Sequence, residues 1–282
     1  MNRNSLIAIL LLVIGLAACA STEHPVTGSL VLYGGDTLQV LTDGTGRVLV
    51  GPKEHAGQFI DATVSAGEVL VVGIDQESRA TGLFAVQETG GSPKLLLAGP
   101  FQSVAASADG LLVALTTRSP DRRSDRYDLV LFDRRTGDVT TLATGVGTYG
   151  TTVAWGPDST SVTYSTPDGL IRSVGSADHV VQELGHGQGP SWSPDGRSLA
   201  YHRARAAYVR AGGKERKVLR RLPWQSDLVG KVYWNPAGTH ISVNAAAGAG
   251  GKELTCLVVD VSSGASTSAV DGSLWCGPWV GE

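Results

Sequence analysis

The sequence predicts an all-β protein, a six-bladed β-propeller of four-stranded antiparallel blades closed by the C-terminal strand. Three observations predict this fold. Glycine is abundant, at 37 of 282 residues, and charged residues are only 17%, as in a folded, turn-rich chain. A hairpin with a Trp-x-Pro-Asp turn recurs, and a second hairpin with a glycine-containing turn follows each copy. Four strands per unit of about 40–45 residues are typical of propeller blades. A two-sheet sandwich, the alternative, has no reason to repeat at this period.

The N-terminal segment, residues 1–18, is interpreted as a signal peptide and excluded from the fold. Arg3 precedes an apolar run from Leu6 to Leu16. Eleven helical residues rise about 16 Å, too short for a hydrocarbon core of about 30 Å. A transmembrane anchor is therefore the weaker interpretation.

The end of the apolar run, Leu16-Ala17-Ala18-Cys19, resembles the lipobox of bacterial lipoproteins. The resemblance implies cleavage before Cys19 and acylation of its thiol, palmitate included. Residues 19–28 would then form a lipidated tether, and residues 29–282 the propeller. The alternative is an ordinary signal peptide cut near Ala18 or Ala20, with Cys19 incidental.

The first hairpin of the repeating unit is clearest at Ser191–Tyr201. Pro194 suits position i+1 of a type I turn, Asp195 position i+2 and Gly196 the position after it. The flanking residues alternate or favour β-structure, so this stretch predicts strand, tight turn, strand. Weaker or altered copies begin at Trp155, Trp234, Ala106 and Val64.

The second hairpin is clearest at Asp128–Leu142, with Thr136-Gly137 in its turn. Its counterparts are the turns at Thr45-Gly46, Gly90-Gly91, Gly175-Ser176, Gly212-Gly213 and Ser263-Gly264. Each unit should have four strands, but the first unit shows only three. We therefore expect the C-terminal strand, around Gly277–Val280, to become the inner strand of blade one and close the ring, which removes an open edge.

The Trp-Ser-Pro-Asp-Gly…Leu-Ala-Tyr unit at Trp192–Tyr201 resembles the WD40-like repeat of TolB-like six-bladed propellers. The resemblance covers nearly the whole chain after residue 28, although the motif is intact only at this copy. Pro-Asp is lost at residues 65–67, and Ala237 replaces the aspartate in the last copy. The resemblance implies the architecture and an extracytoplasmic location rather than a particular partner.

Two cysteines remain once Cys19 is assigned to lipid. In an exported protein they suggest a disulfide between Cys256 and Cys276. The bridge would join the third strand of blade six to the closing strand. The alternative is a pair of free buried thiols.

Known catalytic and metal-binding motifs are missing from the sequence. The six histidines show no metal-ligand spacing, and there is no nucleophile elbow, P-loop or dinucleotide motif. Asp109, Asp158 and Asp195 fit turn positions better than a catalytic carboxylate pair. We therefore predict no catalytic residue, no metal and no cofactor.

Blade five carries a run of basic residues with a single acidic residue, Glu215. The run suits either an anionic surface or a solvated outer strand kept polar against edge pairing, and we favour the second. It consists of Arg203, Arg205, Arg210, Lys214, Arg216, Lys217, Arg220 and Arg221.

The blade-to-blade links differ from one another and hold aromatic residues that turn chemistry does not require. In a propeller these links share one face with the loops between second and third strands, opposite the tight turns. We call this the link face and predict that it binds a partner. Its candidate residues are His55, Phe101, Tyr149, His186, Trp224, Gln225, Asp227 and Trp275.

These observations favour a membrane-tethered, extracytoplasmic propeller that binds or scaffolds a protein or ligand of the cell envelope. The formal net charge of −3 argues against nucleic acid as a partner. An envelope lyase or hydrolase acting on a glycan or polymer is the alternative, because propellers assemble sites from distant blades. A purely structural envelope protein is the third class.

Overall fold

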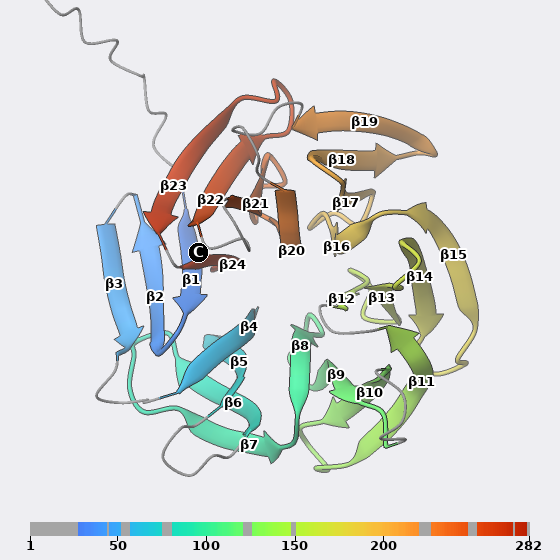
Figure 1. Ribbon diagram of the computed structural model, residues 1–282. Coiled ribbons are helices and arrows are strands. Elements are labelled where there is room, and N and C mark those ends of the chain that lie inside the picture. The colour runs from blue at the N-terminus through green and yellow to red at the C-terminus, as the bar shows by residue number, and fades with distance from the viewer. Residues whose placement is uncertain are drawn as a thin grey trace, which may run out of the picture.

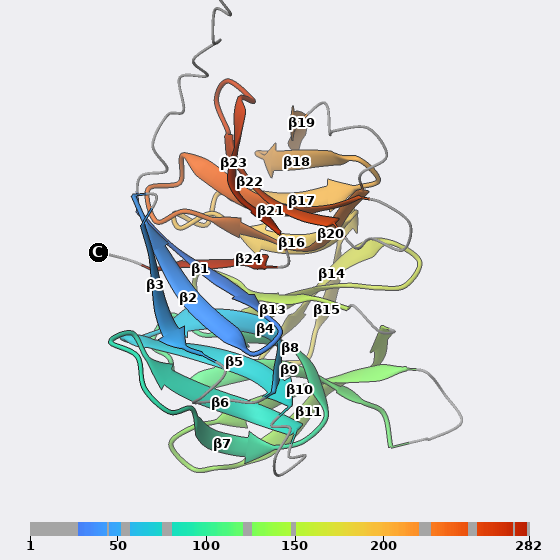
Figure 2. The same cartoon turned by 60° about the vertical axis from the view of Figure 1, so that its left-hand side comes forward.

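The computed structural model describes residues 28–43, 45–51, 57–74, 81–120, 126–147, 151–219, 227–247, 253–272 and 274–280. The predicted signal peptide, Cys19 and all of the predicted tether except Gly28 lie outside them. In the described part, six four-stranded antiparallel sheets surround a central axis (Figure 1). Figure 2 shows the ring from the side of blades one and two, each sheet twisted like a propeller blade. The six-bladed propeller is confirmed.

Every blade runs from an inner strand near the axis to an outer strand at the rim. In this order, blade one consists of β24 (Trp275–Val280), β1 (Ser29–Gly34), β2 (Thr37–Thr42) and β3 (Thr45–Val50). Blade two consists of β4 (Gln58–Ser65), β5 (Glu68–Ile74), β6 (Thr81–Gln87) and β7 (Lys94–Ala98). Blade three consists of β8 (Phe101–Ala106), β9 (Leu112–Arg118), β10 (Tyr127–Asp133) and β11 (Val139–Gly147).

The other three blades follow the same order. Blade four consists of β12 (Val153–Trp155), β13 (Ser161–Ser165), β14 (Leu170–Gly175) and β15 (Val181–His186). Blade five consists of β16 (Gln188–Trp192), β17 (Ser198–Arg203), β18 (Ala206–Ala211) and β19 (Lys214–Leu219). Blade six consists of β20 (Asp227–Trp234), β21 (His240–Ala247), β22 (Glu253–Asp260) and β23 (Ser266–Gly272).

The C-terminal strand closes the ring as expected. β24 pairs antiparallel with β1, with Leu30 opposite Trp279 and Tyr33 opposite Trp275. The first strand of the fold thus gains a partner from the other end of the chain, and blade one becomes four-stranded like the other blades.

The Pro-Asp-Gly turns have the predicted chemistry. In the copy around Pro194, the Gly196 N–H donates to the Ser193 carbonyl, which closes a four-residue turn. The Asp195 carboxylate accepts from the Ser193 hydroxyl and the Arg197 N–H, and these bonds lower its pKa. The same kind of bonding lowers the pKa of Asp109, which confirms that both are turn residues.

The hydrophobic core is divided among the seams of the ring. Each of six clusters of buried apolar side chains joins two neighbouring blades. The repeat tryptophans add a polar bond across three seams. Trp155 Nε1 donates to the Ala105 carbonyl, and Trp192 Nε1 donates to the Thr163 hydroxyl. Trp234 Nε1 likewise reaches the carbonyl of blade five's Ser191.

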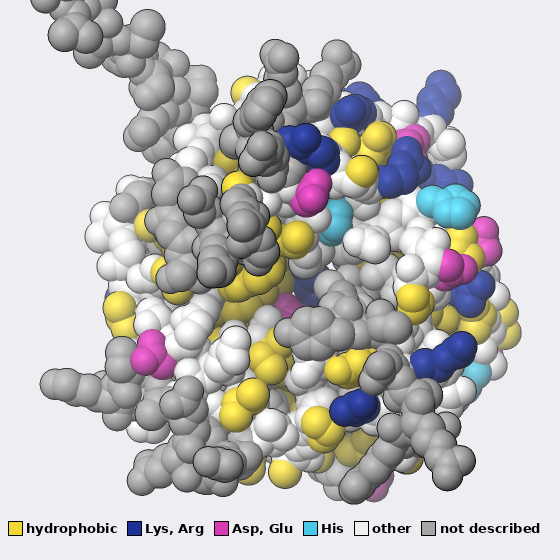
Figure 3. Space-filling model, viewed as in Figure 1, with side chains coloured by type: hydrophobic (Ala, Val, Ile, Leu, Met, Phe, Trp, Pro, Cys, Tyr) yellow, Lys and Arg dark blue, Asp and Glu magenta, His cyan; other side chains and the backbone are white. Residues whose placement is uncertain are grey.

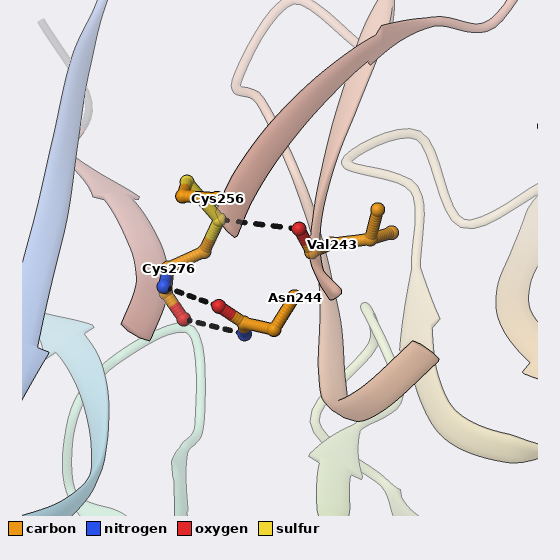
Figure 4. Close-up of a disulfide and its surroundings, with 4 residues drawn as sticks. All are labelled: Val243, Asn244, Cys256 and Cys276. Atoms are coloured by element: carbon orange, nitrogen blue, oxygen red, sulfur yellow. Dashed lines mark hydrogen bonds between the residues drawn. A yellow bond between two sulfur atoms is a disulfide. The ribbon is translucent and has the colours of Figure 1, made fainter. Parts of the chain in front are cut away.

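The predicted disulfide is confirmed. Cys256 of β22 and Cys276 of β24 are bonded, with Cα atoms 5.3 Å apart, and both residues are fully buried. Figure 4 shows Asn244 beside the bridge: its amide donates to the Cys276 carbonyl and accepts from the Cys276 N–H. Side-chain and covalent bonds thus both hold the closing strand to blade six.

Within the described ranges, no helix is long and apolar enough to cross a membrane.

Candidate functional site

A cavity of about 250 Å³ lies at one mouth of the central channel. Figure 3 shows a hollow at the centre of the ring, with acidic and basic side chains visible inside it. Its lining comes mostly from the first residues of inner strands, where the blade-to-blade links enter, so the cavity opens on the link face. The lining residues are Tyr33, Ile60, Asp61, Gln102, Ser103, Thr151, Thr152, Val229, Gly230, Lys231 and Trp275.

Asp61 is the centre of the buried polar network at this site. The residue is 5% exposed, so its charge needs compensation from nearby donors. Both carboxylate oxygens are fully engaged. The donors are Ala62 N at 2.9 Å, Ser103 Oγ at 2.7 Å, Val104 N at 2.9 Å, Lys231 Nζ at 2.7 Å and Tyr233 Oη at 3.0 Å. Oδ1 thus accepts from Ala62 and Tyr233, and Oδ2 accepts from Ser103, Val104 and Lys231.

Lys231 crosses the channel to reach its partners. It belongs to β20 of blade six, and its ammonium donates to the Val104 carbonyl of blade three. Figure 1 shows β20 and β8 facing each other across the centre of the ring. The same ammonium pairs with Asp61 of blade two. Burial lowers the pKa of Lys231, while the Asp61 carboxylate opposes that shift.

Two buried tyrosines complete the network. Burial, reinforced by the negative charge of Asp61, raises the pKa of Tyr33 and of Tyr233 well above the usual value. Both hydroxyls therefore remain protonated, and that of Tyr233 donates to Asp61. Because Tyr33 comes from blade one and Tyr233 from blade six, the carboxylate of Asp61 ties together blades that are distant in sequence.

A buried histidine lies just behind the cavity wall. His202 Nε2 is 3.0 Å from the carbonyl oxygen of Gly230, which lines the cavity. Burial lowers the pKa of His202, so the ring is neutral near pH 7 and its N–H donates to that carbonyl. His202 thereby fixes the backbone of β20 beside Lys231.

The predicted face residues fall into four groups. Trp275 is partly buried and lines the cavity. His186 and Asp227 are exposed, whereas Phe101 is 7% exposed and packs in the core cluster between blades two and three. Phe101 is thus unavailable as a surface anchor. The others, His55, Tyr149, Trp224 and Gln225, lie outside the described residues.

The sequence analysis missed Asp61 and Lys231. One signal was present: each is a charged residue inside a strand whose neighbours are apolar, Asp61 between Ile60 and Ala62, Lys231 between Gly230 and Val232. A charge at such a position must find a partner. The pairing of these two was not readable, because they lie in blades two and six.

Three arginines of the basic run of blade five are bound to the protein itself, while Arg220 and Arg221 lie outside the described residues. Arg203 pairs with Glu215 at 2.8 Å, and Arg210 donates to the Leu184 carbonyl of blade four. Arg216 donates to backbone carbonyls of blade six at Val261 and Ser262. These contacts favour the interpretation of a polar outer strand over an anion-binding patch.

The described residues contain no group of three or more His, Cys, Asp or Glu side chains placed to hold a metal ion. The described lining of the cavity offers the Lys231 amine, the serine, tyrosine and threonine hydroxyls, the Gln102 amide and the Trp275 indole.

Comparisons with known proteins give the fold. No protein-family model matches the sequence, and no curated protein matches it. Among solved structures, a chain of the nidogen/laminin complex matches with a TM-score of 0.66 and 11% identity, over 89% of this chain and 97% of that one. Puromycin hydrolase matches with a TM-score of 0.54 and 15% identity, over 83% of this chain and 42% of that one.

A third similar structure is oligogalacturonate lyase in complex with manganese, with a TM-score of 0.52 and 14% identity, over 82% of this chain and 69% of that one. At these identities the likeness extends to the propeller fold alone. Propellers of this shape occur in a binding complex, a hydrolase and a lyase, so the fold leaves the function to be argued from the site.

Proposed function

We propose that this protein is a membrane-tethered, extracytoplasmic binding module whose propeller takes up a ligand, or a segment of an envelope protein, at the cavity on the link face. The observation that carries the proposal is the cavity itself. It combines apolar walls with a few fixed polar groups, which is the usual composition of a ligand site.

The polar network behind the cavity supports binding. Asp61, Ser103 and Lys231 come from three different blades and are held by short, buried hydrogen bonds. Such a network keeps the cavity in one shape before a ligand arrives, and that reduces the entropy cost of association. In this network the Asp61 carboxylate holds its five donors in place.

Photocrosslinking tests the proposed binding. Gln102 lines the cavity, whereas Thr141 lies exposed on the outer strand β11. A photoreactive amino acid at residue 102, in cells that make the full chain, should give an adduct that the same amino acid at residue 141 does not give. Mass spectrometry of the purified protein identifies the adduct as a small molecule or a peptide. Equal adducts at both positions, or none at either, would contradict a binding role for the cavity.

The membrane tether forms the second half of the proposal. It rests on the apolar run up to Leu16 and on the sequence Leu16-Ala17-Ala18-Cys19. Two acyl chains on Cys19 would be sufficient for stable attachment, whereas a single chain gives only marginal binding.

Metabolic labelling with a palmitate analogue tests the tether. Cys19→Ser should abolish the label and release the protein from the membrane fraction, while Ala20→Ser should leave both unchanged. Label retained by the Cys19→Ser protein would show that the acylation site is elsewhere or that the lipobox interpretation is wrong.

An envelope lyase or hydrolase is the second candidate. The observation that favours it is Lys231, an amine with a lowered pKa on the wall of a cavity. A buried lysine of this kind is suited to proton transfer. Turnover of a cell-wall glycan or polymer by the protein, lost in Lys231→Met, would establish this role in place of simple binding.

A further inference from the structure

The charges at the cavity cancel. Among the described residues that line it, Lys231 is the one amine and Asp61 the one carboxylate, and their side chains lie 2.7 Å apart. A charged ligand would lose its hydration at this site without meeting an opposite charge, which is costly in a partly buried position. The cavity is therefore built for a ligand without net charge.

Two side chains at the cavity, Lys231 and Gln102, offer hydrogen-bond donors to a ligand. An ammonium group has three N–H donors. The Asp61 carboxylate and the Val104 carbonyl take two from Lys231, which leaves one for a ligand. Gln102 contributes an amide to which no described residue bonds. A ligand that carries several oxygen acceptors satisfies both groups.

One wall of the cavity is aromatic. Trp275 lies against the backbone of Gly230, where a Cβ atom would come within 3.3 Å of the indole ring. The positive φ of 72° at Gly230 also disfavours any side chain there. Glycine thus lets the strand pass close to the indole, and the side chains of Ile60 and Val229 extend the apolar lining.

The size of the cavity restricts the ligand further. Pockets for drug-sized molecules begin at about 300 Å³. At about 250 Å³, this cavity accommodates a single ring rather than an extended oligomer.

From these four features, and resting on the proposed binding function, we infer that the cavity binds one uncharged sugar ring. The apolar face of the ring lies on Trp275, and its hydroxyl or acetamido oxygens accept from Lys231 and Gln102. A neutral monosaccharide residue, free or at the end of a glycan, has this combination of an apolar face and oxygen acceptors.

Saturation-transfer NMR on the full chain tests this inference with three probes: methyl glucoside, methyl N-acetylglucosaminide and methyl glucuronide. At least one neutral glycoside should receive saturation at its ring protons, and the glucuronide should bind about tenfold more weakly or not at all. Trp275→Ala should weaken binding of the neutral glycoside by about tenfold or more, because the aromatic contact is lost. Trp192→Phe, an aromatic change away from the cavity, should leave it unchanged.

Because Trp275 is next to the disulfide residue Cys276, Trp275→Ala could disturb folding, so a second variant is needed. Gln102→Leu removes one donor at a partly exposed position and should weaken the neutral glycoside by several fold. Binding of the glucuronide alone, or neutral binding unchanged in both Trp275→Ala and Gln102→Leu, would overturn the sugar assignment. If no glycoside binds but residue 102 still captures a ligand by photocrosslinking, the sugar assignment fails and the binding function stands. Failure of both experiments removes the two proposals together.

Discussion

At the scale of the residue, the carboxylate of Asp61 is the group on which the buried polar network is centred. It receives hydrogen bonds from blades three and six as well as from its own strand. The Lys231 ammonium has few acceptors besides Asp61, since the Val104 carbonyl is its other described acceptor. Removing either member of a buried ion pair leaves the other charge without its partner. In this network we expect the two substitutions to lower the free energy of unfolding by different amounts.

Asp61→Asn should destabilise the protein by about 3–5 kcal/mol, because it leaves the Lys231 ammonium buried without an anion. Lys231→Met should cost less, because the Asp61 carboxylate keeps its bonds from Ser103, Val104 and Tyr233. Denaturant unfolding of the two variants measures the difference. A larger loss for Lys231→Met would mean that the lysine, and not the carboxylate, is the centre of the network.

His202 gives the protein a predictable dependence on pH. Burial lowers its folded pKa below the usual 6.5, so below that pH the unfolded chain takes up a proton that the folded chain refuses. This contribution disfavours the folded state as the pH falls through 6.5, and it is absent at higher pH.

The melting temperature should therefore fall more between pH 7.5 and pH 5.5 for the natural protein than for His202→Gln, whose amide can still donate to Gly230. Identical pH dependence in the two proteins would contradict the assignment to His202.

The residues that could be predicted from the sequence are those whose contacts lie close to them along the chain. Asp195 and Gly196 act within one turn, so their types and order are enough to place them. Asp61 and Lys231 act across the channel, and their partnership depends on how far each blade rotates about the axis. The cysteine pair was predictable despite its two strands, because only two candidates remained.

At the scale of the element, the inner strands determine how one blade meets the next. The tryptophan at the end of β16 donates across the seam to the Thr163 hydroxyl at 2.9 Å. Thr163 is fully buried, and the apolar cluster at this seam has only three buried members. At this seam the polar bond therefore adds to a small apolar contact.

Trp192→Phe should cost about 1–3 kcal/mol, because the Thr163 hydroxyl is left buried without its partner. Thr163→Val in the same chain should recover much of the loss, since replacing both partners by apolar groups can be nearly neutral. A double-mutant cycle by denaturant unfolding measures the coupling. Strictly additive losses would show that the indole acts through packing alone.

At the scale of the whole molecule, the ring closes between blade six and blade one, where the C-terminal strand joins the first blade. Blade one takes its inner strand from the C-terminus, and Cys276 in that strand is bonded to Cys256 of blade six. The bridge closes a loop with a sequence separation of 20, for which the chain-entropy estimate is about 3 kcal/mol. Replacing both cysteines by alanine should lower the free energy of unfolding by about that amount without opening the ring, because β24 still pairs with β1.

Deleting residues 275–282 should have a different effect from removing the disulfide. Without β24, the strand β1 loses its inner partner and exposes a row of unpaired backbone groups that are buried in the closed ring. The deletion also removes Trp279 from the apolar cluster between blades six and one. The truncated protein should self-associate through the open edge, whereas the double-alanine protein should remain monomeric at the same concentration. Size-exclusion chromatography with light scattering separates the two cases. A monomeric, cooperatively folded truncation would show that five complete blades and one three-stranded blade are sufficient, and that the ring does not need its closing strand.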